Sequence, residues 1–73
     1  MIRCNLSILM GRDKLRISDV SRQTGLNRSM VTALYRETAT RVELPAVDRL
    51  CRLFGCQVSD LFEFVPDATE ARP

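Results

Sequence analysis

The sequence predicts an all-α fold in which five short helices form one compact bundle. Three observations support this prediction: apolar residues recur at helical spacing, glycine and proline fall between the helical segments, and two-residue alternation never persists. A chain of 73 residues has room for a single domain. Its composition, 45% hydrophobic and 27% charged, is that of an ordinary globular domain rather than a disordered chain. We expect the domain to span residues 1–66 and a polar tail, DATEARP, to follow over residues 67–73.

Residues that favour helix ends bound the five expected helices. The helices are expected over residues 4–12, 17–24, 27–36, 45–54 and 58–64. Gly25 and Gly55 follow the second and fourth helices, where glycine suits a left-handed C-terminal cap. Asn27 can accept a free amide in the first turn of the third helix, and Pro45 is tolerated in the first turn of the fourth. Pro66 ends the fifth helix.

Apolar residues on each expected helix are spaced so that they share one face, and we expect these faces to meet in a common core. The inward-facing residues are Leu6, Leu9, Met10, Val20, Val31, Leu34, Val47, Leu50, Cys51, Phe54, Val58, Leu61 and Phe62. Ile8 lies off the apolar stripe of the first helix and should be partly exposed.

Cysteine usage argues against disulfides and metal sites. The three cysteines, Cys4, Cys51 and Cys56, are an odd number without the clustering of a metal-binding motif, and the chain has no histidine. We therefore expect free thiols in a cytoplasmic protein that needs no cofactor. No apolar run approaches the roughly 18 residues that a membrane span requires, and the N-terminal segment lacks the long apolar region and cleavage site of a signal peptide. No contact with a membrane is expected.

Charge is distributed unevenly along the chain, although the net charge is only +2. Residues 1–41 hold eight basic and three acidic residues, whereas residues 42–73 hold three basic and six acidic ones. A basic half of this kind is typical of a protein that presents one side to a polyanion such as nucleic acid.

Two short helices joined by Gly25, Leu26 and Asn27 have the layout of a helix-turn-helix unit. The second helix of such a unit commonly lies in the major groove of DNA, with its N-terminal residues against base edges. At about 100° per residue, the face of this helix that points away from the core carries no carboxylate. It consists of Arg28, Ser29, Thr32, Ala33 and Arg36.

This face has the chemistry to read base pairs. Arg28 can pair with both O6 and N7 of a guanine, and Ser29 and Thr32 can hydrogen-bond base edges or phosphates. Ala33 leaves room for a thymine methyl group. A carboxylate-free helix face is more often simply solvated, but the preceding helix, the turn glycine, the Asn27 cap and the basic N-terminal half together favour DNA.

The run ISDVSRQTGLNRSMVTALYRETATRVELPAVDRLCRLFGCQVSDLFEFVPD resembles the phage Cro/repressor-type (Xre-like) helix-turn-helix transcriptional regulators. Its most specific parts are D-V-S-x-x-T-G-L-N-R-S-x-V-x-x-L-Y and D-R-L-C-R-L-F-G-C-Q-V-S-D-L, and the similarity covers about residues 3–67. The resemblance implies a five-helix bundle of the lambda-repressor-like DNA-binding type, with Asn27–Arg36 as the recognition helix. It also implies base contacts at the positions of Arg28, Ser29, Thr32 and Ala33.

The resemblance further implies phosphate contacts near the start of the second helix and in the loop after the recognition helix. The corresponding residues are Ser18, Arg36, Thr40 and Arg41, with Arg12, Lys14 and Arg16 as further candidates. Tyr35 lies at the margin of the core face and is expected to pack against the fourth helix, with its hydroxyl free for water or a phosphate.

Three positions depart from the family pattern. Ile17 stands where the family often has a glutamine that braces the recognition helix, and Arg16 stands where a capping serine or threonine is usual. Arg36 and Glu37 stand where Asn-Gly often makes a tight turn. We expect a weaker cap on the second helix and a different course for the loop after the recognition helix.

Together these features predict a sequence-specific double-stranded DNA-binding regulator of transcription from a bacterium or phage, acting as a repressor and as a homodimer. Phe62, Phe64 and Val65, together with Ile8, exceed what one small core needs and are expected to form the dimer surface. Their alternative role is to close the core. Pairing two modules on half-sites one helical turn apart would multiply the modest affinity of one.

The alternative function is that of an antitoxin or protein-interaction module whose main partner is a protein, docked on the acidic C-terminal half. An enzyme is not expected, because the sequence has no histidine, no glycine-rich phosphate loop and no cysteine beside an activating base. A small-molecule substrate is not expected either.

Overall fold

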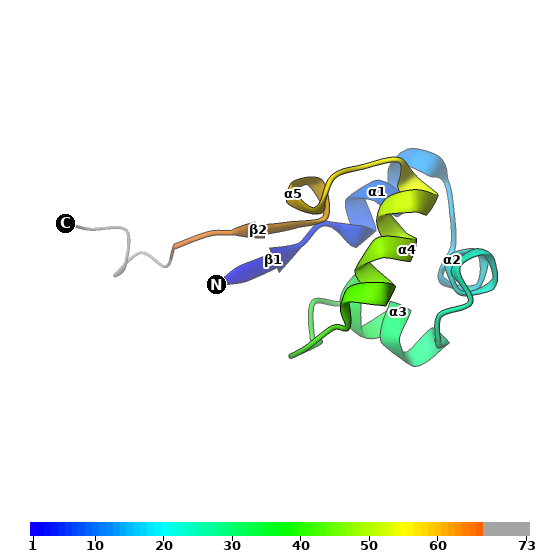
Figure 1. Cartoon of the computed structure of the whole chain (residues 1–73), viewed down its shortest axis with the longest axis horizontal. Helices are drawn as coiled ribbons and strands as arrows, with labels where there is room; N and C mark the ends of the chain where they lie inside the picture. The colour runs from blue at the N-terminus through cyan, green and yellow to red at the C-terminus, as the bar shows by residue number, and fades with distance from the viewer. Residues whose placement is uncertain (67–73) are drawn as a thin grey trace.

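The computed structural model describes residues 1–66, in which five helices pack together and a two-stranded antiparallel sheet projects from them (Figure 1). The elements in chain order are β1 (Ile2–Cys4), α1 (Leu6–Asp13), α2 (Ile17–Thr24), α3 (Arg28–Tyr35), α4 (Leu44–Phe54), α5 (Val58–Leu61) and β2 (Phe62–Phe64). The five expected helices are confirmed, but the expectation of an all-α fold is wrong at both ends of the domain. The expected tail, residues 67–73, lies outside the described residues.

Strands β1 and β2 replace helix that the sequence predicted at residue 4 and at residues 62–64. The paired residues are Ile2 and Phe64, Arg3 and Glu63, and Cys4 and Phe62. The ladder continues outward, because the Val65 amide donates to the Met1 carbonyl at 2.8 Å. Each strand has three residues, too few to register as alternation, and each depends on a partner at the opposite end of the domain. We call the ribbon formed by β1 and β2 the arm.

A single core lies between the helices and the base of the arm. Its buried members are Cys4, Leu6, Leu9, Met10, Val20, Val31, Leu34, Val47, Leu50, Phe54 and Leu61. The expectation is wrong for Val58, which is 56% exposed. Helix α5 makes a single turn, and this turn buries Leu61, as expected, but leaves Val58 at its start in solvent. Cys51 and Phe62 pack against the core while remaining partly exposed, and Ile8 is exposed as predicted.

Side chains close to each helix start hold the N-termini of α2 and α3. The Asn27 side-chain oxygen accepts the Ser29 amide at 2.7 Å, which confirms the predicted cap of α3. Arg16 gives α2 no cap, because its side chain offers no acceptor. The Asp19 carboxylate accepts the Arg16 amide at 2.9 Å, which is the half of a capping box that the third helical residue provides.

Candidate nucleic-acid interface

Bonds among neighbouring residues build the turn between α2 and α3. Gly25 has a φ of 75°, the left-handed conformation predicted for it. The buried Thr24 hydroxyl donates to the Val20 carbonyl at 2.6 Å and accepts the Leu26 amide at 3.2 Å. The Ser21 hydroxyl donates to the Leu26 carbonyl at 2.6 Å. These bonds hold the direction in which α3 leaves the turn.

Helix α3 presents the predicted recognition face to solvent. Val31 and Leu34 are at most 2% exposed and anchor the opposite face in the core. All four residues predicted to contact bases keep accessible surface: Arg28 and Ser29 are exposed, and Thr32 and Ala33 are half-buried. The structure therefore brings the four together on one accessible face of one helix.

The basic candidates differ in whether they already have an acidic partner. Arg12 lies 2.8 Å from an oxygen of Asp13, and Arg16 lies 3.6 Å from an oxygen of Asp19. Within residues 1–66, no carboxylate pairs with the remaining basic candidates, which are Lys14, Arg28, Arg36 and Arg41. A cation without a partner can bind a phosphate without first losing an ion pair.

The side chain of Arg12 is engaged within the fold. Its guanidinium donates to both carboxylate oxygens of Asp13, at 2.8 and 3.0 Å, and to the Phe54 carbonyl at 2.9 Å. The Phe54 contact satisfies a free carbonyl at the end of α4, which stops at the left-handed Gly55 as predicted. The two hydrogen bonds from Arg12 to the Asp13 carboxylate lower the pKa of Asp13. Because α4 ends on the opposite side of the helical body from α3 (Figure 1), Arg12 does not join the recognition face.

A surface hollow connects the start of α2 with the recognition face. Arg16, Ser18, Arg28 and Tyr35 line it together with apolar residues of α1 and α2. Two phosphate candidates, Arg16 and Ser18, thus border the same hollow as the base candidate Arg28. Tyr35 is 42% exposed there. Ile17 cannot replace the hydrogen bonds of the family's glutamine, and it packs against the core instead.

Asp19 organises the N-terminus of α2. Besides accepting the Arg16 amide, its carboxylate lies 3.6 Å from Arg16 Nε and 3.1 Å from Arg22 Nη2. The hydrogen bond from the Arg16 backbone amide lowers the pKa of Asp19, and the two nearby guanidinium groups lower it further. The side chain of Arg16 is nevertheless 85% exposed, so it stays accessible to a phosphate.

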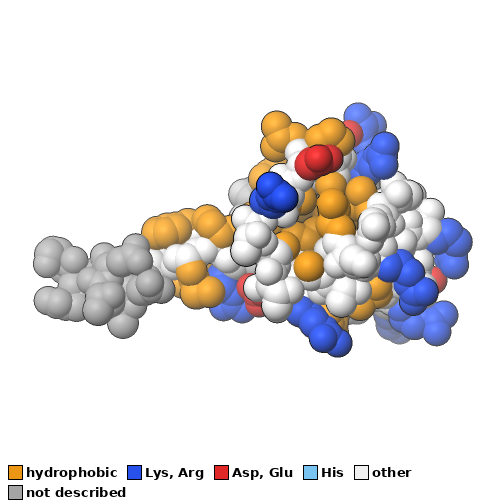
Figure 2. Space-filling view, turned by 90° about the horizontal axis from the view of Figure 1, so that it is seen from below, with side chains coloured by type: hydrophobic (Ala, Val, Ile, Leu, Met, Phe, Trp, Pro, Cys, Tyr) orange, Lys and Arg blue, Asp and Glu red, His pale blue; other side chains and the backbone are white. Residues whose placement is uncertain are grey.

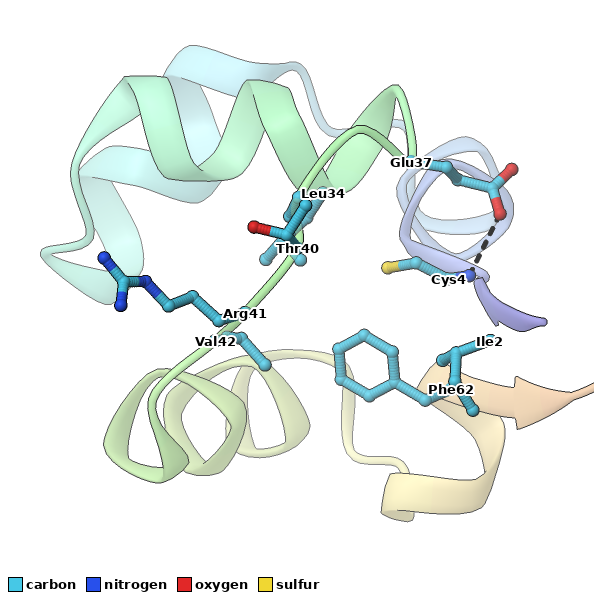
Figure 3. Close-up of a pocket in the computed structure, with 9 residues that line it drawn as sticks. Ile2, Cys4, Leu34, Glu37, Thr40, Arg41, Val42 and Phe62 are labelled. Atoms are coloured by element: carbon cyan, nitrogen blue, oxygen red, sulfur yellow. Dashed lines mark hydrogen bonds between the residues drawn. The ribbon is translucent and has the colours of Figure 1, made fainter.

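The loop after α3 carries the second group of phosphate candidates. The Thr38 amide donates to the Ala33 carbonyl at 2.9 Å, which holds the loop against the end of α3. Arg36, Thr40 and Arg41 are all exposed. Thr40 and Arg41 border a pocket between this loop and the arm, and the side chain of Arg41 extends away from the arm (Figure 3). The predicted phosphate contacts therefore form two groups, one at the start of α2 and one in this loop.

Glu37 has a role that the sequence did not reveal. Its φ of 60° is the left-handed conformation that suits the glycine often found at this place in the family. Its carboxylate accepts Arg3 Nε at 2.9 Å and the Cys4 amide at 3.1 Å. The hydrogen bond from Arg3, followed by that from the Cys4 amide, lowers the pKa of Glu37. No local pattern predicts this contact, because it joins segments that are far apart in the sequence.

The surface on the side of α3 combines basic and apolar regions. Figure 2 shows basic side chains around the helical body, with fewer acidic ones among them. Apolar side chains cover the arm and a hollow near the centre of this face. The basic region suits a phosphate backbone, and the arm adds an apolar extension beside it.

Other kinds of site find little support in the described part of the chain. Within residues 1–66, no three histidine, cysteine, aspartate or glutamate side chains are grouped to hold a metal ion. None of the helices there is long and apolar enough to pass through a lipid bilayer. The thiol of Cys4 is buried, which raises its pKa, and those of Cys51 and Cys56 are half-buried.

A helix-turn-helix whose second helix presents an accessible, carboxylate-free face is the arrangement found in one class of protein, the helix-turn-helix DNA-binding domains. Residues 5–67 match the family model of the Cro/C1-type HTH DNA-binding domain, and the chain belongs to this family. It is also 21% identical over 63 residues to an uncharacterized HTH-type transcriptional regulator, YozG, of Bacillus subtilis (strain 168). That similarity covers 86% of this chain and 75% of the relative. The resemblance predicted from the sequence motifs is therefore confirmed.

Proposed function

We propose that this protein is a sequence-specific double-stranded DNA-binding transcriptional repressor that acts as a homodimer. One observation carries the proposal: Arg28, Ser29, Thr32 and Ala33 are accessible together on α3, and Arg28 has no carboxylate partner within residues 1–66. Family membership supports DNA as the ligand. The name of the Bacillus subtilis relative supports regulation of transcription.

In this proposal α3 enters the major groove with its first turn closest to the bases. Arg28, in that first turn, donates to O6 and N7 of a guanine. Ser29 and Thr32 hydrogen-bond neighbouring base edges, and Ala33 accommodates a thymine methyl group.

Phosphate contacts are assigned to the two groups of residues that flank α3. They are Lys14, Arg16, Ser18, Arg36, Thr40 and Arg41. These contacts position the helix but carry little sequence information. Arg12 is left out, because binding a phosphate would require its guanidinium to leave the Phe54 carbonyl and the Asp13 carboxylate.

The arm is the proposed dimer surface. The strand pairing places Ile2, Cys4, Phe62 and Phe64 on one face of the ribbon. This face is buried at its base, where Cys4 is 7% exposed, and open at its tip, where Ile2 and Phe64 are 64% and 62% exposed. An apolar strip that continues from the core into solvent favours packing against another apolar surface. Val65, half-buried, adjoins this strip at the end of β2.

A second copy of the chain is the proposed occupant of this surface, since one domain alone contacts DNA over a small area and binds it with modest affinity. A single module covers only about 600–1,000 Å² of its own surface on DNA. Two modules on half-sites about one helical turn apart combine their affinities. In a twofold symmetric pair the same patch meets itself, so the arm provides both sides of the interface.

Selection of bound fragments from random duplex DNA tests the proposal. The purified protein is expected to enrich a twofold symmetric sequence with half-sites about 10 base pairs apart. Failure to enrich any sequence at moderate salt would contradict the proposed function. That outcome would favour the alternative, an antitoxin or interaction module that binds a protein partner.

Repression needs a separate experiment, because DNA binding alone does not set the direction of regulation. The selected sequence is placed over a promoter that drives a reporter gene, and the protein is expected to lower reporter expression. Arg28→Ala protein at the same cellular level should lower expression less, because it binds the operator more weakly. Higher expression with the wild-type protein would identify an activator instead.

A further inference from the structure

Glu37 is fastened to the end of the recognition helix by backbone bonds. It follows Arg36, the C-terminal cap of α3, and its amide donates to the Leu34 carbonyl at 3.2 Å. The amides of the next two residues both donate to the Ala33 carbonyl. The position of Glu37 is therefore fixed relative to the last turn of α3.

All three donors that reach the Glu37 carboxylate come from β1. Arg3 Nε and Nη2 lie 2.9 and 3.3 Å from its oxygens, and the Cys4 amide lies 3.1 Å away. Met1 and Val65 form a hydrogen-bonded pair, since each backbone amide donates to the carbonyl of the other. Hydrogen-bonded and non-hydrogen-bonded pairs alternate along an antiparallel ladder, so Cys4 and Phe62 are a non-hydrogen-bonded pair and the Cys4 amide points away from β2. Glu37 thus provides the partner that this edge amide lacks in the sheet.

Elsewhere the arm and the end of α3 face one another across an open pocket. The pocket measures about 280 Å³, with Ile2 and Phe62 on the arm side and Leu34 on the α3 side (Figure 3). Among the side-chain hydrogen bonds of residues 1–66, those of Glu37 alone join the arm to the segment after α3. The side chain of Asn5, at the start of α1, instead donates to the Asp60 carbonyl of α5 and to Glu63 of β2. Cys4 and Phe62 pack the base of the arm against the core, and across the open pocket the carboxylate ties the arm to the end of α3.

We propose that Glu37 is a positioning residue that sets the angle between the arm and the recognition helix. This inference rests on the proposed function, in which the arm forms the dimer and α3 reads DNA. A symmetric dimer repeats the same angle in both copies, so the angle determines how far apart the two recognition helices lie. Glu37 thereby selects the spacing of the two half-sites without touching DNA.

The test uses operators that differ only in the spacing between the two selected half-sites. Fluorescence anisotropy measures binding of wild-type and Glu37→Gly proteins to duplexes with the half-sites shifted by one or two base pairs. Glycine removes the carboxylate yet suits the left-handed backbone at this position, so the variant is expected to keep its fold. We expect the wild type to prefer one spacing by roughly tenfold, and Glu37→Gly to bind neighbouring spacings within about threefold.

Two further variants keep the test independent of folding. Arg3→Ala removes two of the three bonds to the carboxylate at a side chain that is 47% exposed, so a smaller broadening in the same direction is expected. Arg52→Ala breaks an ion pair that stays within α4, and it should leave the spacing preference unchanged. Base preference within each half-site should be the same in all variants, because no base contact is altered.

The outcomes separate this inference from the function on which it rests. A wild-type protein that is monomeric, or that binds all spacings equally, would contradict the proposed dimer. A wild-type preference that Glu37→Gly and Arg3→Ala both retain would overturn the positioning role and leave the DNA-binding function standing. Loss of the preference in Glu37→Gly and a smaller loss in Arg3→Ala, with sedimentation still showing a dimer, would support it.

Discussion

The amide of Leu26 donates to the hydroxyl of Thr24 across the turn between α2 and α3, at 3.2 Å. The same hydroxyl donates to the Val20 carbonyl at 2.6 Å, and the Thr24 side chain is buried. One side chain thus serves as donor to α2 and as acceptor for the turn. Together with the bond from the Ser21 hydroxyl to the Leu26 carbonyl, this pair of bonds holds the turn that leads into α3.

Replacing Thr24 by valine removes both bonds while keeping the shape of the side chain. The Leu26 amide then loses its protein partner, so the free energy of unfolding should fall by about 1–3 kcal/mol. Thr24→Ser keeps the hydroxyl and loses one methyl group, and it should cost about 1 kcal/mol. Urea denaturation of both variants measures the difference. A valine variant as stable as the wild-type protein would contradict a structural role for the hydroxyl.

Gly25→Ala is expected to lower the free energy of unfolding by about 1–2 kcal/mol, because φ there is 75°. An added Cβ would meet only Arg49 Nη1, at 3.8 Å, so the cost is conformational rather than steric. Gly11 is the matched control, since it lies inside α1 and a Cβ there meets nothing within 4 Å. Gly11→Ala should raise stability by about 0.5–1 kcal/mol. Denaturation curves that shift in the same direction for both variants would refute this explanation.

Arg28→Ala is expected to weaken binding to the selected operator by about 1–3 kcal/mol and to relax the preference at one base pair. The physical reason is the loss of a bidentate contact to one guanine. Competition between the operator and its single-base-pair variants measures the effect. Equal losses on the operator and on random DNA would contradict a base-reading role for Arg28.

Arg41→Ala is expected to weaken binding to all sequences alike and to reduce the slope of log K against log salt by about one unit. A phosphate contact releases counterions but does not distinguish bases. Arg52→Ala is the matched control, because Arg52 is paired with Asp48 at 3.1 Å on α4, outside the proposed interface. An unchanged salt slope for Arg41→Ala, or the same change for Arg52→Ala, would rule out this contact.

Phe64→Glu is expected to dissociate the dimer and leave the monomer folded, because the Phe64 side chain is 62% exposed. Operator binding should weaken in parallel, since the two modules no longer bind as a linked pair. Val58→Glu introduces the same charge at a 56% exposed position outside the arm and should leave the dimer intact. Sedimentation gives the mass of each variant. If Phe64→Glu changed neither mass nor operator affinity, the arm would not be the dimer surface.

Stability should decline in acid because partners within the fold lower the pKa of three carboxylates. These are Asp13, held by Arg12, Asp19, held by the Arg16 amide, and Glu37, held by Arg3. Each adds stability above its ordinary pKa, about 3.9 for aspartate and 4.3 for glutamate, which is lost as pH falls through its folded-state pKa. The urea midpoint should fall from about pH 5 downwards, and less steeply for Glu37→Gln. Parallel profiles for the two proteins would contradict the role of Glu37.

Helices and the recognition face could be predicted because short-range bonds determine them. Asn27 caps α3 through an amide two residues away, and Gly25 takes its left-handed conformation within the turn itself. Val31 and Leu34 place one face of α3 in the core, which leaves Arg28 and its neighbours outside. The residues that determine the cap, the turn and the apolar face of α3 all lie within a single stretch of about ten residues.

The arm and the partners of the charged residues could not be predicted, because they join distant parts of the chain. Residues 2–4 and 62–64 form strands only by pairing with each other. Arg12 is held by Phe54, and Glu37 is held by Arg3, across the folded domain. The sequence by itself therefore determined the helix-turn-helix and the residues on the accessible face of α3. Packing of the whole domain determined which basic side chains stay free and where the arm points, since these depend on contacts that exist only after folding.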